Sequence, residues 1–303
     1  MSRDQTEQTV GRLDAALSEA LTVITQFFLH ASILKAQEHP LARRCYREWV
    51  ELMRRSDRLL EGILDLGGRP SSHKATRLEL GRAPRRIFEL DVARAERWVA
   101  LLETTAADCA SARSDETASM LRELLDAESV SLEWRRSQRD ELADDGDAVT
   151  SSPSIDVALT EALDSVLRAE LSAITQVYYH GQLFEAWSAE ELGAFLANET
   201  WEKTWRSLEL TERLLATGAY PTEDEHGELR IGRDVGEILD RDRECVDAQL
   251  AALETALERC DVTLHPEIHD LLSRMRVGEQ RHADWIAAQT EGIARRGADD
   301  FGA

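Results

Sequence analysis

The sequence predicts an all-α protein built from two tandem antiparallel four-helix bundles. Three observations support this prediction. The chain has 303 residues, which is enough for about two domains. It contains only 6 Pro and 16 Gly, so long helices are easily accommodated. Residues 17–30 (LSEALTVITQFFLH) reappear as residues 167–180 (LRAELSAITQVYYH), which indicates an internal repeat.

The repeat continues beyond its first helix, because Gly81 aligns with Gly232 when one residue is inserted after the first helix pair. In the second helical segment, apolar residues recur at spacings of three and four from Tyr46 to Ile63, which places them on one helix face. Each copy divides into four helical segments, at about 9–36, 40–66, 82–110, 114–140, 156–186, 188–217, 233–260 and 266–293.

Turn residues separate these segments. The strings GGRP (67–70) and GAYP (218–221) end the second helix of each copy, with Gly at the cap and Pro beyond it. The acidic, Ser-, Pro- and Gly-containing stretch between the copies indicates a linker. We therefore expect a first bundle at 1–142, an acidic linker at 143–155 and a second bundle at 156–303. No strand pattern is found.

The net charge of −22 excludes some partners. Such a surface repels nucleic acid and anionic membranes, so we expect neither as a partner. It attracts cations such as iron, or it reflects adaptation to high salt. The four cysteines show no CxxC spacing, which argues against a disulfide scaffold or a thiolate metal site. The N-terminus is polar and no stretch approaches a membrane span, so we expect a cytoplasmic protein.

Several motifs resemble those of bacterioferritins. The strings LTVITQFFLHA (21–31) and LSAITQVYYHG (171–181) resemble the first helix of that family. Met53 and its surroundings on the second helix, and Glu279-x-x-His282 on the last, extend the likeness over nearly all of both copies. The resemblance implies two ferritin-like bundles, iron storage in a hollow shell, haem bound between subunits, and Fe(II) oxidation at a dinuclear centre.

A dinuclear centre of this kind needs about four carboxylates and two histidines, including a Glu-x-x-His pair from each of two helices. The first copy fails this test. Of the six ligand positions it retains one carboxylate, Glu128, and we expect Glu128 and Arg55 to form a salt bridge in place of a metal site. The other positions fall on Ala20, Leu52, Ala95 and Ser131.

The second copy retains three of the six ligands, namely Glu170, Glu279 and His282. The second-helix pair falls on Lys203 and Arg206, and the third-helix position falls on a valine. Two carboxylates facing two cations sum to neutral without any metal, so we expect a salt-bridge network.

Two alternatives stay open at this second site. Glu170, Glu279 and His282 could hold a single zinc or Fe(II) ion, since both metals accept one histidine and two carboxylates. A one-residue shift of the second helix would also bring Glu202 toward the cluster.

Met53 occupies the position that resembles the haem-ligating methionine of bacterioferritins, which makes it a candidate axial ligand of haem. The alternative is a packing methionine, because Met fills irregular gaps well. The second copy has Thr204 there, flanked by Trp201 and Trp205. The recurring histidines, His30 and His180, indicate a buried hydrogen-bonding role common to both bundles.

We therefore consider three functions. The first is a ferroxidase-deficient structural or storage subunit of iron metabolism, which forms a homo-oligomer or co-assembles with a bacterioferritin. The second is haem binding through Met53. The third is a metal-dependent oxidase or ferroxidase that uses Glu170, Glu279 and His282.

Overall fold

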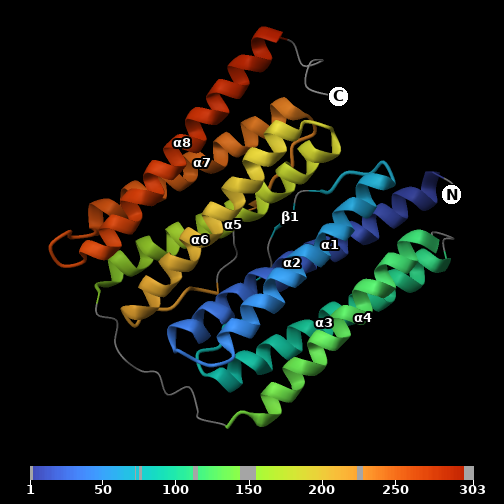
Figure 1. The fold of residues 1–303 in the computed structure, drawn as a ribbon, viewed down its shortest axis with the longest axis horizontal. Helices are drawn as coiled ribbons and strands as arrows, with labels where there is room; N and C mark the ends of the chain where they lie inside the picture. The colour runs from blue at the N-terminus through green and yellow to red at the C-terminus, as the bar shows by residue number, and fades with distance from the viewer. Residues whose placement is uncertain are drawn as a thin grey trace. The chain divides into compact units, whose positions relative to one another are not determined.

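A computed structural model of the protein describes residues 3–71, 73–74, 77–111, 115–143, 155–223 and 228–296. Over these residues the chain is almost entirely helical (Figure 1). Its helices are α1 (Arg3–Ala36), α2 (Ala42–Asp65), α3 (Pro84–Ser111), α4 (Asp115–Glu141), α5 (Val157–Ala186), α6 (Glu190–Ala216), α7 (Val235–Arg259) and α8 (Pro266–Arg296).

The all-α prediction is confirmed, and each predicted segment corresponds to one helix. The largest difference is at the start of α1, which begins at Arg3 rather than at residue 9. Its first turn carries Asp4 and an ion pair between Arg3 and Glu7, both of which favour helix at an N-terminus. The apolar periodicity begins only later, so the sequence pattern missed this turn.

The described residues also include one short ladder that the sequence did not predict. Strand β1 (His73–Lys74) pairs antiparallel with β2 (Glu228–Leu229). Each strand has two residues, which is too short for an alternating pattern to be recognised. The prediction that the chain has no strands is therefore wrong at this ladder, but the fold class remains all-α.

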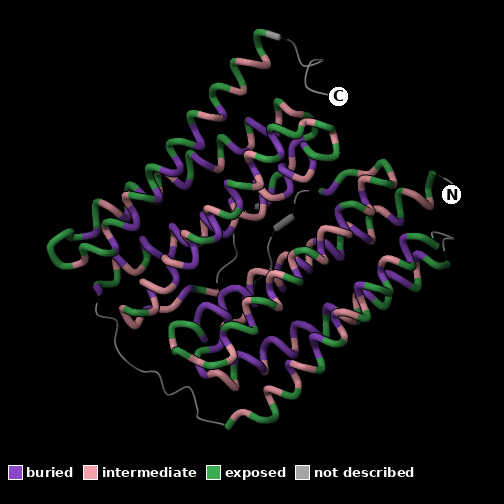
Figure 2. Tube along the Cα trace, in the orientation of Figure 1, coloured by how far each residue is buried: buried purple, intermediate pink, exposed green. Residues whose placement is uncertain are grey.

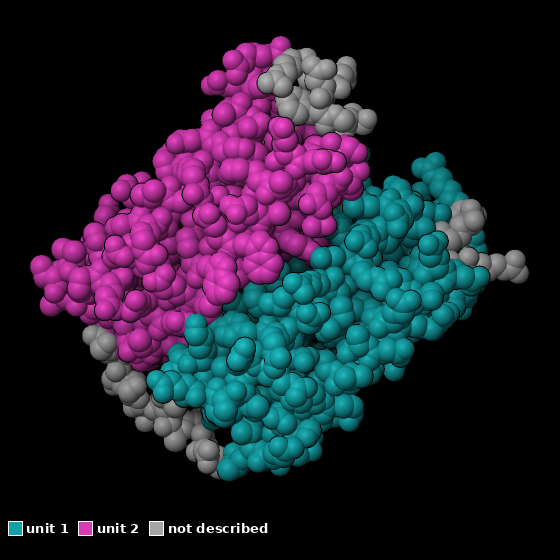
Figure 3. Space-filling view, in the orientation of Figure 1, with its two compact units in different colours: residues 1–71, 75–151, 223–225 teal, residues 72–74, 152–222, 226–303 magenta. Residues whose placement is uncertain are grey.

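The chain divides into two compact units (Figure 3). Unit 1 comprises residues 1–71, 75–151 and 223–225, and unit 2 comprises 72–74, 152–222 and 226–303. In unit 1, α1 and α4 each pack against both α2 and α3, and α5 to α8 repeat this arrangement in unit 2. Each unit is thus a four-helix bundle with one long connection, between its second and third helices. Of the predicted linker, residues 144–154 lie outside the described residues.

Buried residues recur along each helix of both bundles (Figure 2). Leu17, Leu52 and Trp98 belong to the core of unit 1, and Leu167 and Phe184 belong to that of unit 2. Helix α1 is apolar and long enough to cross a membrane. The expectation that no stretch approaches a membrane span is therefore wrong, as far as length and composition are concerned. However, 72% of its most apolar window is buried inside the structure, as in the core helix of a soluble bundle.

Local sequence signals set several helix ends. The side chain of Asp156 accepts a hydrogen bond from the Leu159 amide at the start of α5, and Asp234 caps α7 in the same way. Gly67 and Gly218 follow α2 and α6 with φ of 68° and 82°, the left-handed conformation that favours glycine. The helix ends predicted at GGRP and GAYP are therefore confirmed.

The recurring histidines tie the same parts of each bundle together. In unit 1, Nδ1 of His30 on α1 lies 2.6 Å from Oδ1 of Asp91 on α3. The Gly81 amide donates to His30 Nε2 at 2.9 Å, so Nδ1 is the ring nitrogen that carries the proton. In unit 2, His180 and Asp242 repeat the 2.6 Å contact. The hydrogen-bonding role predicted for both histidines is confirmed.

Candidate functional site

The predicted ligand positions of unit 2 meet in the middle of the bundle around Lys203. This side chain from α6 is fully buried, at 0% exposure. Its Nζ donates to Glu279 Oε2 of α8 at 2.5 Å and to Gln249 Oε1 of α7 at 3.0 Å. Arg206 donates from Nη2 to the other Glu279 oxygen, Oε1, at 2.5 Å. Both oxygens of Glu279 are thus bound to cations.

The charges around Glu279 determine its ionisation. Burial alone would raise the pKa of Glu279, but Lys203 and Arg206 together hold the pKa below its ordinary value. Glu279 is therefore a carboxylate whose charge is neutralised inside the protein. Gly278 leaves room for this arrangement, because a Cβ there would collide with the Arg206 guanidinium unless that side chain shifted.

Glu170 of α5 is in a different state from Glu279. It is fully buried, and the side chain of Gln249 faces its carboxylate and favours the ionised form. This contact is outside ordinary hydrogen-bond geometry. Burial, and then the negative charge of Glu279, raise the pKa of Glu170 to about 7, although Lys203 and Arg206 oppose the shift. Glu170 is therefore partly protonated near neutral pH.

His282 lies one turn along α8 from Glu279 and is also fully buried. Neither ring nitrogen has a hydrogen-bond partner among the described residues. Burial, and then the positive charge of Lys203, lower the pKa of His282 to about 4, so the imidazole is neutral at physiological pH. Next to it, the rings of Phe195 and Trp285 stack at 3.8 Å.

Sequence reasoning missed one member of this cluster, Glu199 of α6. It is buried, and its Oε2 lies 4.0 Å from Nδ1 of His282. Its other oxygen accepts a hydrogen bond from Arg281 at 3.0 Å. Glu199 precedes Lys203 by one helical turn, so the i,i+4 spacing could have identified it. Glu202, which we considered instead, is 42% exposed and binds Arg281 at the surface.

The residues of unit 2 do not fit a metal centre as they stand. Among the residues that the structure describes, no three His, Cys, Asp or Glu side chains are placed so that they could hold a metal ion. Glu279 is engaged by Lys203 and Arg206, and it is not available to join Glu170 and His282 in a three-ligand site. Instead, the cations provide the positive charge that a metal would supply.

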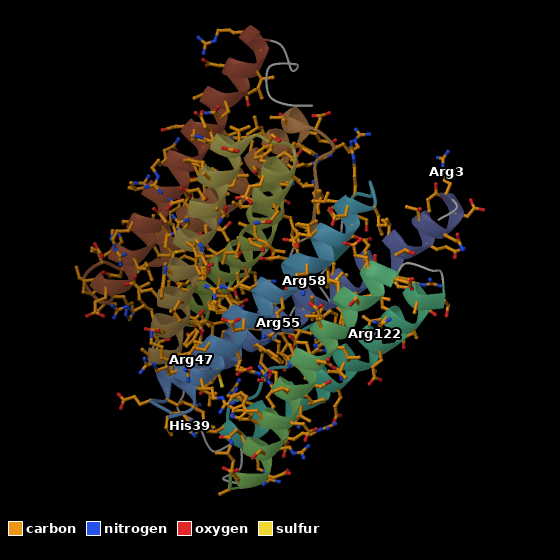
Figure 4. All side chains as sticks on the ribbon, turned by 45° about the vertical axis from the view of Figure 1, so that its right-hand side comes forward. Arg3, His39, Arg47, Arg55, Arg58 and Arg122 are labelled. Carbon is orange, nitrogen blue, oxygen red and sulfur yellow. The ribbon has the colours of Figure 1, made fainter. Side chains whose placement is uncertain are left out.

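Unit 1 has a smaller polar cluster at the corresponding place. Arg55 of α2 donates from Nε to Glu128 Oε1 of α4 at 2.7 Å, and Figure 4 shows Arg55 on α2 between Arg47 and Arg58. Burial raises the pKa of Glu128, and Arg55 opposes the shift. The remaining ligand positions are filled by the buried residues Ala20, Leu52, Ala95 and Ser131.

Ser131, which replaces the histidine, belongs to a second ionic group in unit 1. Its hydroxyl donates to Glu48 Oε2 at 2.8 Å and accepts a hydrogen bond from Arg135. The Arg135 guanidinium also lies 3.9 Å from the centre of the Phe27 ring, in a cation–π contact. The position of the histidine in unit 2 is thus used in unit 1 to hold a buried arginine.

Met53 is half-buried on α2, away from the Arg55–Glu128 pair. It follows Tyr46 and Val50 by seven and three residues, so the three share a helix face. Tyr46 and Val50 line a groove of about 720 Å3, whose other lining residues are Arg44, Arg47, Glu48, Glu51 and Arg54. Thr204, the counterpart of Met53 in unit 2, is buried, whereas Trp201 and Trp205 beside it are exposed.

A model of the ferritin-like domain matches the chain twice, at residues 10–144 and 160–296. The chain belongs to the ferritin-like family. Because the two matches cover both bundles in succession, the tandem duplication is also confirmed.

Proteins similar to this ferritin-like chain carry the names bacterial ferritin and bacterioferritin. The bacterial ferritin of Synechocystis sp. is 27% identical over 145 residues, which are 48% of this chain and 93% of that protein. The bacterioferritin of Mycobacterium bovis is 26% identical, over 46% of this chain and 89% of its own length. That of Brucella melitensis is 25% identical, over 47% and 88% respectively. Each relative therefore corresponds to about one of the two bundles, and the predicted resemblance to bacterioferritins is confirmed.

Proposed function

We propose that this bacterioferritin-like chain acts in iron metabolism as a ferroxidase-deficient structural or storage subunit, or as a partner of an active bacterioferritin. One observation carries the proposal. Lys203 and Arg206 bind both oxygens of Glu279, in the bundle that retains most of the expected ligands. A cytoplasmic location is part of this proposal.

Electrostatics supports the absence of ferroxidase activity. An Fe(II) substrate entering unit 2 would have to displace a lysine and an arginine from a buried carboxylate. Removing one partner from a buried ion pair costs about 3–5 kcal/mol. In unit 1, apolar residues and Ser131 replace the ligands, so that bundle offers even fewer donors.

The test is Fe(II) oxidation in air by the purified chain, with a bacterioferritin that has a full ligand set as positive control. We expect the chain to oxidise Fe(II) no faster than buffer does. Rapid oxidation that is lost in Glu170→Ala and His282→Ala would overturn the proposal and favour the oxidase alternative, which uses Glu170, Glu279 and His282.

The subunit role is tested separately by native mass spectrometry of the chain, alone and co-expressed with a bacterioferritin. A homo-oligomer or a mixed particle much heavier than two chains is expected. A mass of one or two chains under both conditions would rule out the shell and the mixed assembly.

A second function, haem binding, is favoured by a groove lined by Tyr46 and Val50, which share a face of α2 with Met53, although Met53 itself is not one of the lining residues. Tyr46 and Val50 give this groove aromatic and apolar surface. Two of its arginines, Arg44 and Arg54, pair with Glu48 and Glu51, and Arg47 adds a positive charge that suits a porphyrin carboxylate. Met53 would supply a thioether to the iron from the same helix face. Haem would then serve electron transfer, which is the chemistry that this group provides when bound.

The haem proposal predicts a Soret band in protein purified after expression with haem precursors. We expect the band to disappear in Met53→Ala and to persist in Met120→Ala, which changes a methionine of α4. A wild-type protein without a Soret band after incubation with haem would contradict the proposal.

A further inference from the structure

The solvent-facing stripe of α6 carries two tryptophans where a bundle helix ordinarily carries charged residues. From residue 194 to residue 205, the exposed residues of α6 are Ala194, Asn198, Trp201 and Trp205, whose spacings of three and four keep them on one helix face. Trp201 is 43% exposed and Trp205 is 64% exposed, whereas the other five tryptophans of the chain are buried or half-buried. Large aromatic side chains gathered on one exposed face indicate an interaction surface. We call Asn198, Trp201 and Trp205 the tryptophan stripe.

Ion pairs fix the surface on which Trp205 stands. Glu202 binds Arg281 of α8 at 2.6 Å, one turn before Trp205, and Glu209 binds Arg274 of α8 at 2.8 Å, one turn after it. These pairs join α6 to α8 on both sides of the ring. Trp205 is therefore an apolar group with a polar rim, which is the arrangement found at the centre of protein interfaces.

Unit 1 carries arginines on the corresponding stripe of α2. The repeat aligns Arg47, Val50 and Arg54 with the three residues of the tryptophan stripe, and we call them the arginine stripe. Both arginines are exposed, and Figure 4 shows Arg47 on α2. Arg54 holds Glu51 at 3.2 Å in an exposed ion pair, which costs little to break. Helix α2 has six basic and five acidic residues, a net charge of +1, whereas α6 has three and six, a net charge of −3.

We propose that the arginine stripe of one chain docks on the tryptophan stripe of a second copy of the chain. A guanidinium group over a tryptophan ring is a favoured cation–π arrangement, and arginine and tryptophan are the residue types that contribute most to the binding energy of interfaces. The inference rests on the subunit role in the proposed function, because it names the surface through which chains associate.

Charge favours this mixed contact over a contact between like stripes. Two arginine stripes would place guanidinium groups against one another. Two tryptophan stripes would bring two strongly acidic second halves together, since residues 151–303 have 14 basic and 31 acidic residues. Because each chain carries one stripe of each kind, two chains related by a two-fold axis make the mixed contact twice. The second contact then forms within an existing pair, which strengthens the association.

The test measures self-association of the full chain by analytical ultracentrifugation, without haem because the arginine stripe also lines the groove on α2. The tryptophan variant is Trp201→Gln with Trp205→Gln, the arginine variant is Arg47→Glu with Arg54→Glu, and the control with the same charge change elsewhere in unit 1 is Arg3→Glu with Arg122→Glu. We expect the wild type and the control to associate equally. Each stripe variant should have a dissociation constant at least about tenfold higher, which corresponds to about 1.4 kcal/mol.

Mixing the two stripe variants distinguishes a mixed contact from a contact between like stripes. The tryptophan variant keeps its arginine stripe and the arginine variant keeps its tryptophan stripe, so an equimolar mixture should form pairs joined by one contact. These pairs should be tighter than those of either variant alone. The inference is overturned if the wild type stays a single chain at every concentration, if either stripe variant associates like the wild type, or if mixing restores nothing.

The substituted side chains lie at the surface, so circular dichroism should show unchanged helicity in every variant. A wild type that stops at two chains and loses this pairing in the stripe variants would support the contact while contradicting the shell. A larger particle that survives in both stripe variants would support the subunit role and overturn the contact.

Discussion

The two bundles share a backbone arrangement but differ in what fills their centres. Both join an arginine of the second helix to a glutamate of the fourth, as Arg55–Glu128 and Arg206–Glu279. Among the residues that the structure describes, only the centre of unit 2 adds a buried lysine, two further buried glutamates and a buried histidine. The shared pair thus belongs to the scaffold common to both bundles, whereas the Lys203 cluster is particular to the second.

Charge follows the same division. Residues 1–150 carry 22 basic and 27 acidic residues, and residues 151–303 carry 14 and 31, so the net charge is −5 in the first half and −17 in the second. The acidity of the chain is therefore mainly a property of the second half.

The largest difference between the bundles should appear on removing their buried cations. Lys203→Met leaves buried carboxylates short of a cation and should lower the free energy of unfolding by about 3–5 kcal/mol. Arg55 is 23% exposed, so water screens part of its pair with the buried Glu128, and Arg55→Met should cost about 1–3 kcal/mol. Urea unfolding measures the change in the free energy of unfolding for each variant. Hydrogen exchange should show that Lys203→Met destabilises α5–α8. Equal losses of stability in Lys203→Met and Arg55→Met would show that the two bundles do not differ in how much they depend on a buried cation.

Glu170 should make unit 2 lose stability as the pH rises from acid to neutral. Its carboxyl titrates near 4.5 when unfolded and near 7 when folded, so the folded state holds the proton more tightly and stability falls as pH rises between these values. Glu170→Gln does not titrate, and at pH 8 we expect it to be more stable than the wild type by about 3 kcal/mol. Urea midpoints from pH 4 to pH 8 measure this. The exposed variant Glu202→Gln should show no such gain.

His282 should make unit 2 less stable at acid pH, which is the reverse of the pH dependence expected from Glu170. Its pKa is 6.5 when unfolded and about 4 when folded, so the unfolded state takes up the proton first and stability falls as pH drops from 6.5 to 4. At pH 5 this loss is about 2 kcal/mol, and His282→Gln should remove it. Thermal unfolding at pH 7 and pH 5 tests the point. The same change at His269, outside the cluster on α8, should leave the acid sensitivity in place.

The smallest effect concerns the glycine that admits Arg206. Gly→Ala inside a helix ordinarily stabilises it by about 1 kcal/mol. At Gly278 the added methyl group would meet the Arg206 guanidinium, so we expect Gly278→Ala to destabilise by about 1 kcal/mol instead. Ala127 holds the matching position in unit 1, and Ala127→Gly should cost a similar amount through helix propensity alone. A stabilised Gly278→Ala, measured by thermal unfolding, would show that Arg206 is not constrained there.

Much of the fold could be predicted because repetition and periodicity are strong signals. The glycines after α2 and α6 and the apolar stripe from Tyr46 to Ile63 are local features that tertiary contacts did not override. The turn of α1 before residue 9 and the two-residue strands escaped prediction, since neither has a periodic pattern.

At the site, the resemblance to bacterioferritins placed Lys203 and Arg206 opposite the remaining acids, but it could not show how they pair. Glu279 takes both cations and Glu170 takes neither, a choice that depends on side-chain reach and on the space left by Gly278. Glu199 could not be predicted from the expected ligand positions, because none of them falls on it; Glu202 lies nearer to one of them in sequence but is at the surface.

The two paired histidines are a feature that both copies of the duplicated segment have in common. After duplication each copy is free to accumulate changes, yet His30–Asp91 and His180–Asp242 keep the same 2.6 Å contact while the ligand positions around them have been replaced differently. In both copies the histidine ring also accepts the amide of the glycine before the third helix. What the two copies share is therefore the attachment of the long connection to the bundle, whereas the residues between the helices differ from one copy to the other.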